Sequence, residues 1–214
     1  MRLRTALGVA AADLYHHSWR LVVLNMFLGA VLLGIVLATV AVPAAVALAV
    51  LLGPAAVAVM HCAVTLAQTE DLRLGEVITG LRRHWRRGLL LGVLVAAAAL
   101  LGIIAVPFYG QAGTWAWPLA ALTVYVLVLF LLLQLALWPL AVYEAARPFR
   151  DVLRGAAYAV ARRPAGFAAL GLALLLVNAI GVVAAILPFL TLTIAYSFLV
   201  AAHFALPKNP SREV

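Results

Sequence analysis

The positions of the charged side chains divide the chain into three long apolar stretches. Residues 21–68, 88–143 and 164–206 contain no Asp, Glu, Lys or Arg. A helix needs about 20 apolar residues to cross about 30 Å of hydrocarbon, so each stretch is long enough for two crossings. The pattern therefore predicts an all-α integral membrane protein with six transmembrane helices. A re-entrant segment or an odd number of helices is the alternative arrangement.

The segments before these stretches are polar, but their apolar residues recur at helical spacing. Such a face is typical of an amphipathic helix that lies in the interface plane of a membrane. The same unit then occurs three times. It consists of an amphipathic helix, a rising helix that runs from the cytoplasmic to the external side, an external turn, and a falling helix that returns to the cytoplasmic side. Every unit begins on the same side of the membrane. The sequence predicts one polytopic membrane domain with parallel-repeat hairpins at about 1–68, 69–143 and 144–206 and a polar tail at 207–214.

Each falling helix is expected to begin at or near a proline. Proline fits the first turn of a helix, where its missing N–H would have no partner. The three prolines are Pro43, Pro118 and Pro188, and the last ends a predicted external turn at 186–188.

Composition and charge agree with a membrane location and predict an orientation. The chain is 67% hydrophobic with a mean hydropathy of +1.15, whereas apolar residues make up roughly half of a soluble domain. All 15 Lys and Arg residues lie in the two terminal segments and in the loops at 69–87 and 144–163. Because basic residues of short loops concentrate on the cytoplasmic side, both termini are predicted to be cytoplasmic. The same rule accounts for the net charge of +8, so no nucleic acid partner is expected.

Trp and Arg side chains gather where the amphipathic segments meet the membrane. A Trp ring anchors among lipid headgroups and a guanidinium near phosphates, and each basic residue near the surface attracts anionic lipid by about 1 kcal/mol. A cytoplasmic or membrane protein is the alternative partner for this surface. The candidate docking residues for lipid or a partner are Trp19, Arg20, Arg82, Arg83, Trp85, Arg86, Arg87, Arg147, Arg150, Arg154, Arg162 and Arg163.

Polar residues recur toward the cytoplasmic ends of the three predicted falling helices. One interpretation is that they line a hydrated vestibule and contact a small polar ligand. The other is that they hydrogen-bond neighbouring helices, as Gln, Thr and His side chains do in membrane bundles. The spacing is compatible with both. These ligand or vestibule candidates are His61, Thr65, Gln68, Gln134, Trp138, Tyr196 and His203.

The sequence contains few groups suited to chemistry inside the membrane. Cys62 is the single cysteine, which excludes an internal disulfide and a multi-cysteine metal site. The five histidines have no HxxxH or HExxH spacing, so neither a metal nor another cofactor is expected. A proton relay usually needs carboxylates or basic groups at depth, and the apolar stretches lack them. An intramembrane enzyme would have only Cys62 as nucleophile, so the chain is not expected to be an enzyme.

Three segments of the chain carry a resemblance to a known family. They are the run Leu51-Leu52-Gly53-Pro54-Ala55, the stretch from Gly75-Glu76-Val77 to His84-Trp85-Arg86-Arg87, and Trp138-Pro139-Leu140 followed by residues 149–164. In these features the chain resembles the YesL-like bacterial integral membrane proteins, a family without an established biochemical activity. The resemblance implies a multi-pass protein of the bacterial cytoplasmic (inner) membrane that is associated with carbohydrate uptake by ABC transporters.

Two functional hypotheses follow from the residues and the resemblance. The first is a non-enzymatic accessory, scaffold or regulatory partner of a membrane transporter, with ABC transporter subunits and anionic lipids as its partners. The second is an autonomous small-solute transporter or channel built around a pseudo-threefold helix bundle. In that case His61, Gln134 and His203 would be its gate or ligand contacts.

Overall fold

A computed structural model describes residues 3–69, 71–184 and 193–207. The described residues form helices and contain no strand. In chain order the helices are α1 (Leu3–His16), α2 (Ser18–Ala41), η1 (Pro43–Leu51), α3 (Leu52–Thr69), α4 (Glu76–Gln111), η2 (Thr114–Ala116), α5 (Trp117–Tyr143), α6 (Phe149–Arg162), α7 (Pro164–Ala184) and α9 (Ile194–Ala205), where η marks a 3₁₀ helix. The prediction of an all-α fold is confirmed.

Five helices are long and apolar enough to cross a membrane. They are Ser18–Ala41, Ala44–Thr69, Glu76–Gln111, Thr114–Tyr143 and Pro164–Val183. The apolar helix α9 has 12 residues, fewer than the about 20 that a full crossing requires. These lengths are those of a multi-pass membrane protein, whereas the sixth crossing stays a prediction. The expected turn at 186–188, with Pro188, lies outside the described residues.

The amphipathic segments join the following helices in two different ways. The helical conformation is interrupted at His17, between α1 and α2, and at Arg163, between α6 and α7. The residue after Arg163 is Pro164. Proline disfavours the helical conformation of the residue before it, which explains the second break. The prediction of a separate amphipathic helix in the middle unit is wrong, because α4 continues for 36 residues from Glu76 into the apolar stretch. No proline occurs in α4 before Pro107, so nothing ends the helix where its polar part meets the apolar part.

Proline lies at the start of both described falling segments. Pro43 is the first residue of η1, a 3₁₀ helix of nine residues that continues into α3. Pro118 is the second residue of α5. Gly113 turns the chain between α4 and α5 with a φ of 104°, a conformation that other L-residues rarely adopt.

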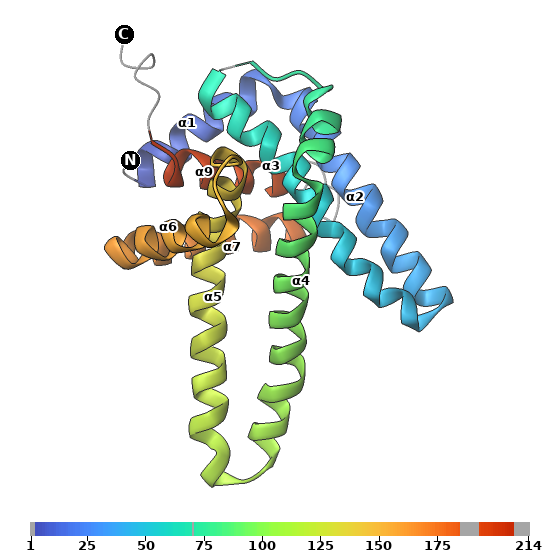
Figure 1. The fold of residues 1–214 in the computed structure, drawn as a ribbon, viewed down its shortest axis with the longest axis vertical. Helices are drawn as coiled ribbons and strands as arrows, with labels where there is room; N and C mark the ends of the chain where they lie inside the picture. Colours follow the sequence, from blue (N-terminus) through green and yellow to red (C-terminus); the bar gives the residue numbers. More distant parts are fainter. Residues whose placement is uncertain (1–2, 70, 185–192, 208–214) are drawn as a thin grey trace.

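Two helical arms extend from a region where many helices meet (Figure 1). The α4–α5 hairpin forms the long arm, and α2 with η1 and the start of α3 forms a second arm at an angle to it. At the other end, α1, α9 and the C-terminal half of α3 lie together. Most of the buried residues belong to the region where α1, α9 and the C-terminal half of α3 meet the other helices, so the core lies there and not along the two arms.

Helices α3, α5 and α9 form the centre of this core. They pack against one another in all three pairings, and their contact includes the fully buried side chains of Met60, Leu137 and Leu199. Each of them also packs on one amphipathic segment, so that α3 contacts α4, α5 contacts α6, and α9 contacts α1. The contact of α9 with α1 brings the described C-terminal helix back to the first helix of the chain.

Three glycines allow α3 and α4 to approach closely. A Cβ atom on Gly53 would lie 2.8 Å from the Cα of Gly92, and one on Gly88 would lie 2.5 Å from the Cα of Pro54. Such distances are shorter than real Cβ contacts, so these positions have no room for a side chain. Small residues at helix crossings are typical of membrane proteins, in which association depends on close backbone packing. The run at residues 51–55 therefore lies at a packing contact between α3 and α4.

Candidate functional site

His61 lies in α3 and faces the polar part of α4. Its Nε2 lies 3.2 Å from Oε2 of Glu76, and its ring centre lies 5.2 Å from that of His84. Gly80 leaves space for the His61 ring, since a Cβ there would lie 2.8 Å from the His61 Cβ. His84 is buried, and its Nε2 has no hydrogen-bond partner among the described residues. His61 therefore links a falling helix to the amphipathic segment that follows it in the chain.

His203 makes an equivalent link between α9 and α1. Its Nε2 lies 2.8 Å from Oδ2 of Asp13, and only 5% of its side chain is exposed. Two turns earlier in α9, the Tyr196 hydroxyl donates a hydrogen bond of 3.2 Å to the carbonyl of Leu7 in α1. Asp13 and Glu76 were not among the sequence candidates. Helical spacing relates only residues of the same helix. It could not identify these partners, because His203 and Asp13 are far apart in the sequence and a loop separates His61 from Glu76.

Gln134 and Trp138 lie in the wall of a cavity of about 300 Å³. The cavity is bounded by α3, α5, α7 and α9, and its other polar residues are Asn178 and Ser197. The Trp138 ring stacks on Phe198, with ring centres 6.4 Å apart and an angle of 18° between the planes. The structure thus brings two of the vestibule candidates together, but it places His61 and His203 against carboxylates of other helices.

The Gln134 amide is buried without satisfying its hydrogen-bonding groups. Both Nε2 and Oε1 lack a partner among the described residues, and 7% of the residue is exposed. An unsatisfied buried polar group costs about 1–3 kcal/mol. The nearby Asn178 is different, since its Nδ2 donates to Ser197 Oγ at 2.8 Å and to the Leu174 carbonyl at 2.7 Å. An amide in this state indicates either a strained packing position or a place for a ligand.

The other vestibule candidates of α3 are partly buried. The Thr65 carbonyl accepts a 2.8 Å hydrogen bond from the Thr69 hydroxyl, and Gln68 lies one turn from Thr65. Another buried amide joins α2 to α9, because Asn25 Oδ1 accepts a hydrogen bond of 2.8 Å from the Ala195 N–H. This bond agrees with the interpretation that amides connect neighbouring helices.

Two of the docking candidates, Arg87 and Arg20, bind backbone carbonyls. The Arg87 guanidinium donates to the carbonyls of Ala141, Glu144, Ala145 and Arg147, where α5 ends. The last carbonyls of a helix have no partner within it, and a guanidinium fork can satisfy several of them at once. Arg87 therefore caps a helix, a role that the sequence pattern alone did not predict.

Arg20 makes a similar contact just beyond the end of α3. It donates to the Leu72 carbonyl and lies 3.3 Å from Oδ1 of Asp71. Desolvation acts to raise the pKa of the Asp71 carboxyl, but hydrogen bonds from the Leu72 backbone, Arg73 and Arg20 hold that pKa below its ordinary value. Arg20 and Arg87 thus occupy similar positions in the first two predicted units.

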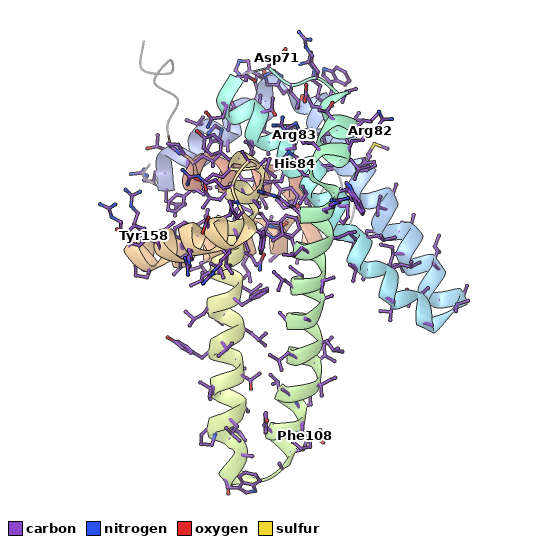
Figure 2. The ribbon with its side chains drawn as sticks, in the orientation of Figure 1. Asp71, Arg82, Arg83, His84, Phe108 and Tyr158 are labelled. Atoms are coloured by element: carbon purple, nitrogen blue, oxygen red, sulfur yellow. The ribbon has the colours of Figure 1, made fainter. Side chains whose placement is uncertain are left out.

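The remaining basic and aromatic candidates are exposed. Arg20 lies over the Trp19 ring at 5.5 Å and Arg86 over the Trp85 ring at 5.6 Å, while Arg147 pairs with Glu144 at 3.0 Å. In Figure 2, Arg82 and Arg83 extend from the polar part of α4, at the end of the molecule opposite Phe108. The exposed arginines among the docking candidates are Arg82, Arg83, Arg86, Arg147, Arg150, Arg154, Arg162 and Arg163.

The described residues contain no group of three or more His, Cys, Asp or Glu side chains suited to a metal ion. Cys62 is buried in α3. Comparisons of the chain with protein-family models, with curated proteins and with solved structures gave no match. The resemblance to the YesL-like proteins therefore stays a prediction from the sequence pattern.

Proposed function

We propose that this chain is a non-enzymatic protein of the bacterial cytoplasmic membrane that serves as an accessory, scaffold or regulatory partner of a transporter. The proposed topology has six crossings in three parallel-repeat hairpins, with both termini in the cytoplasm. Its support is the recurrent contact of each falling helix with an amphipathic segment, α3 with α4, α5 with α6 and α9 with α1. By the resemblance, the partner would be an ABC transporter for carbohydrate.

The exposed α4–α5 hairpin is the observation that carries this proposal. In the most apolar window of each of these helices, only 11% of the residues are buried within the molecule. Ile103 is 72% exposed and Leu131 is 63% exposed, and both lie on the long arm of Figure 1. Within a membrane, such a hairpin offers its apolar sides to lipid or to helices of another protein. A protein that encloses a solute path by itself would bury more of its helices.

The two histidine pairs also support a role without transport. His61 and His203 each have a carboxylate partner, Glu76 and Asp13, that belongs to an amphipathic segment. Histidines held in this way are suited to fixing amphipathic segments against the core. The three central helices in addition contact one another through buried apolar side chains.

One observation favours the alternative of an autonomous small-solute transporter. The cavity at Gln134 and Trp138 also contains Asn178 and Ser197, so a small polar molecule would find several hydrogen-bonding groups there. Uptake by the purified protein in liposomes, lost in a Gln134→Leu variant, would favour this alternative.

Site-specific photocrosslinking tests the accessory role. A photoreactive amino acid at Ile103 or Leu131, introduced into cells that make the protein at native levels, should give a discrete adduct with an integral membrane protein. The matched control is Leu91, which lies in α4 like Ile103 but is fully buried, and which should give only internal products. Identification of transporter subunits by mass spectrometry would support the proposal. Adducts with lipid alone, together with solute uptake by the purified protein, would contradict it.

A further inference from the structure

Gln134 lies in the walls of two cavities, one along residues 134–138 of α5 and one along residues 127–134. The first is the cavity of about 300 Å³ that contains Trp138. The second, of about 350 Å³, lies between α4 and α5. On α5 the second cavity is lined by residues 127, 130, 131 and 134, which repeat at helical spacing and place Gln134 at one end of the row. Both volumes are near the lower limit of ligand sites, roughly 300–1,000 Å³.

The second cavity is apolar apart from Gln134. Its lining consists of Val95, Ala98, Ala99, Gly102, Ile103, Leu127, Phe130, Leu131 and Gln134. Ile103 and Leu131 are also among the most exposed apolar residues of the molecule, so the cavity opens toward the surroundings of the hairpin. A molecule that enters here from the bilayer would meet hydrocarbon side chains first and one amide last.

We infer that the Gln134 amide and the two adjoining cavities bind a neutral long-chain alcohol from the bilayer, with its hydroxyl at Gln134 and its chain in the apolar cavity. Among the described residues, neither the donor Nε2 nor the acceptor Oε1 of this amide has a hydrogen-bond partner. A hydroxyl group both accepts and donates, so it can satisfy the two atoms together. This inference does not depend on the proposed partner role.

The depth of Gln134 favours a neutral ligand over a phospholipid. Gln134 lies nine residues before Tyr143, the last residue of α5, which corresponds to about 14 Å at a rise of 1.5 Å per residue. The described residues that line the two cavities include no basic side chain. A phosphate at this depth would lose its hydration without gaining a cation, whereas a hydroxyl requires only the hydrogen bonds that Gln134 offers.

Quenching of Trp138 fluorescence tests the inference, because this ring lines the first cavity beside Gln134. The single-tryptophan protein is made by replacing Trp19, Trp85, Trp115 and Trp117 with Phe, since all four are exposed. It is reconstituted in dioleoylphosphatidylcholine liposomes with increasing 2,3-dibromostearyl alcohol, whose bromine atoms lie next to the hydroxyl and so near Gln134 and Trp138. Parallel liposomes contain phosphatidylcholine with 9,10-dibromostearoyl chains, whose bromine atoms lie within the hydrocarbon. The alcohol should reach half-maximal quenching at a mole fraction at least tenfold lower than the brominated phospholipid.

Substitutions at the site distinguish a bound alcohol from general lipid contact. Gln134→Met keeps the length of the side chain but removes both polar atoms, and it should abolish the preference for the alcohol. Ala98→Leu should weaken the preference, because Ala98 lines the apolar cavity between α4 and α5 and a larger side chain there reduces the space for the chain of the alcohol. Gln111→Met, at an exposed position at the end of α4, is the matched control and should keep the preference.

Two results would overturn the inference. One is equal quenching by the two brominated lipids in the single-tryptophan protein with Gln134 intact. The other is a preference for the alcohol that persists in folded Gln134→Met. Circular dichroism of every variant shows whether its helices are retained. If Gln134→Met does not fold, Ala98→Leu decides the test, and a preference that persists there overturns the inference.

Discussion

Replacing Gly88 with alanine tests the close approach of α3 and α4. A Cβ atom at this position would lie 2.5 Å from the Cα and 2.8 Å from the N of Pro54. Ordinary contact begins at 3.4 Å, so the methyl group is too close to Pro54 by about 0.9 Å. The obstructing atoms belong to the backbone of α3, and no side-chain rotation can relieve the clash. The two helices would have to separate, which would weaken the packing of Gly53 and Gly92 as well.

The expected magnitude follows from two opposing effects. Overpacking a well-packed contact costs about 1–3 kcal/mol. An alanine in place of a glycine inside a helix stabilises by about 0.5–1 kcal/mol when the added methyl group has free space. Because the backbone obstruction removes the free space on which the gain depends, overpacking should dominate, and we expect Gly88→Ala to lower the free energy of unfolding by about 1–2.5 kcal/mol in total. Gly88→Leu should be more damaging, since its larger side chain must be accommodated at the same point.

Unfolding in mixed micelles by increasing dodecyl sulfate, followed by circular dichroism, measures this change. Gly34→Ala is the matched control, because Gly34 also lies in an apolar helix but has no atom within 4 Å of an added Cβ. This control should leave stability unchanged or raise it by about 0.5–1 kcal/mol. If Gly88→Ala and Gly34→Ala have the same stability, the close contact between α3 and α4 is not as described.

Three further predictions concern the polar contacts and the topology. Arg87→Lys should lower the free energy of unfolding in the same assay by about 1–3 kcal/mol, because an ammonium cannot replace a guanidinium fork that binds several carbonyls. Arg83→Lys, at an exposed position of the same segment, should be neutral within about 0.5 kcal/mol. A double-mutant cycle with Asp13→Ala and His203→Ala should give a coupling energy of about 0.5–3 kcal/mol, and additivity of the two changes would contradict their pairing. A reporter fused at Gly110 should be external, and its labelling from the cytoplasm would contradict the six-crossing topology.

Two of the segments on which the predicted resemblance rests lie at contacts between α3 and α4 in the structure. Gly53 and Pro54 of the first run meet Gly88, which directly follows the end of the second stretch, at the crossing of α3 and α4. His84 and Glu76 of the second stretch lie beside His61. Both segments therefore include packing positions of α3 and α4.

The spacing of the polar candidates in the sequence predicts which of them share a side of a helix, but it does not predict their partners on other helices. The spacing of His61, Thr65 and Gln68 correctly places them along one side of a helix. It contains no information on which side chain of another helix faces them. His61 proves to face Glu76 and His203 to face Asp13, while Gln134 faces two cavities. The candidates therefore belong to different contacts, although they share a position near the ends of their helices.

The sequence by itself determined the helical class, the membrane-spanning lengths and the concentration of charge in the loops. These properties depend on local composition and period, because an apolar run of sufficient length has to satisfy its backbone hydrogen bonds internally within lipid. Only the tertiary structure decided that α4 continues without a break, that Arg87 caps α5 and that Gln134 remains unsatisfied. Each of these outcomes depends on which helices meet and at what distance, and such contacts join residues that are far apart in the chain.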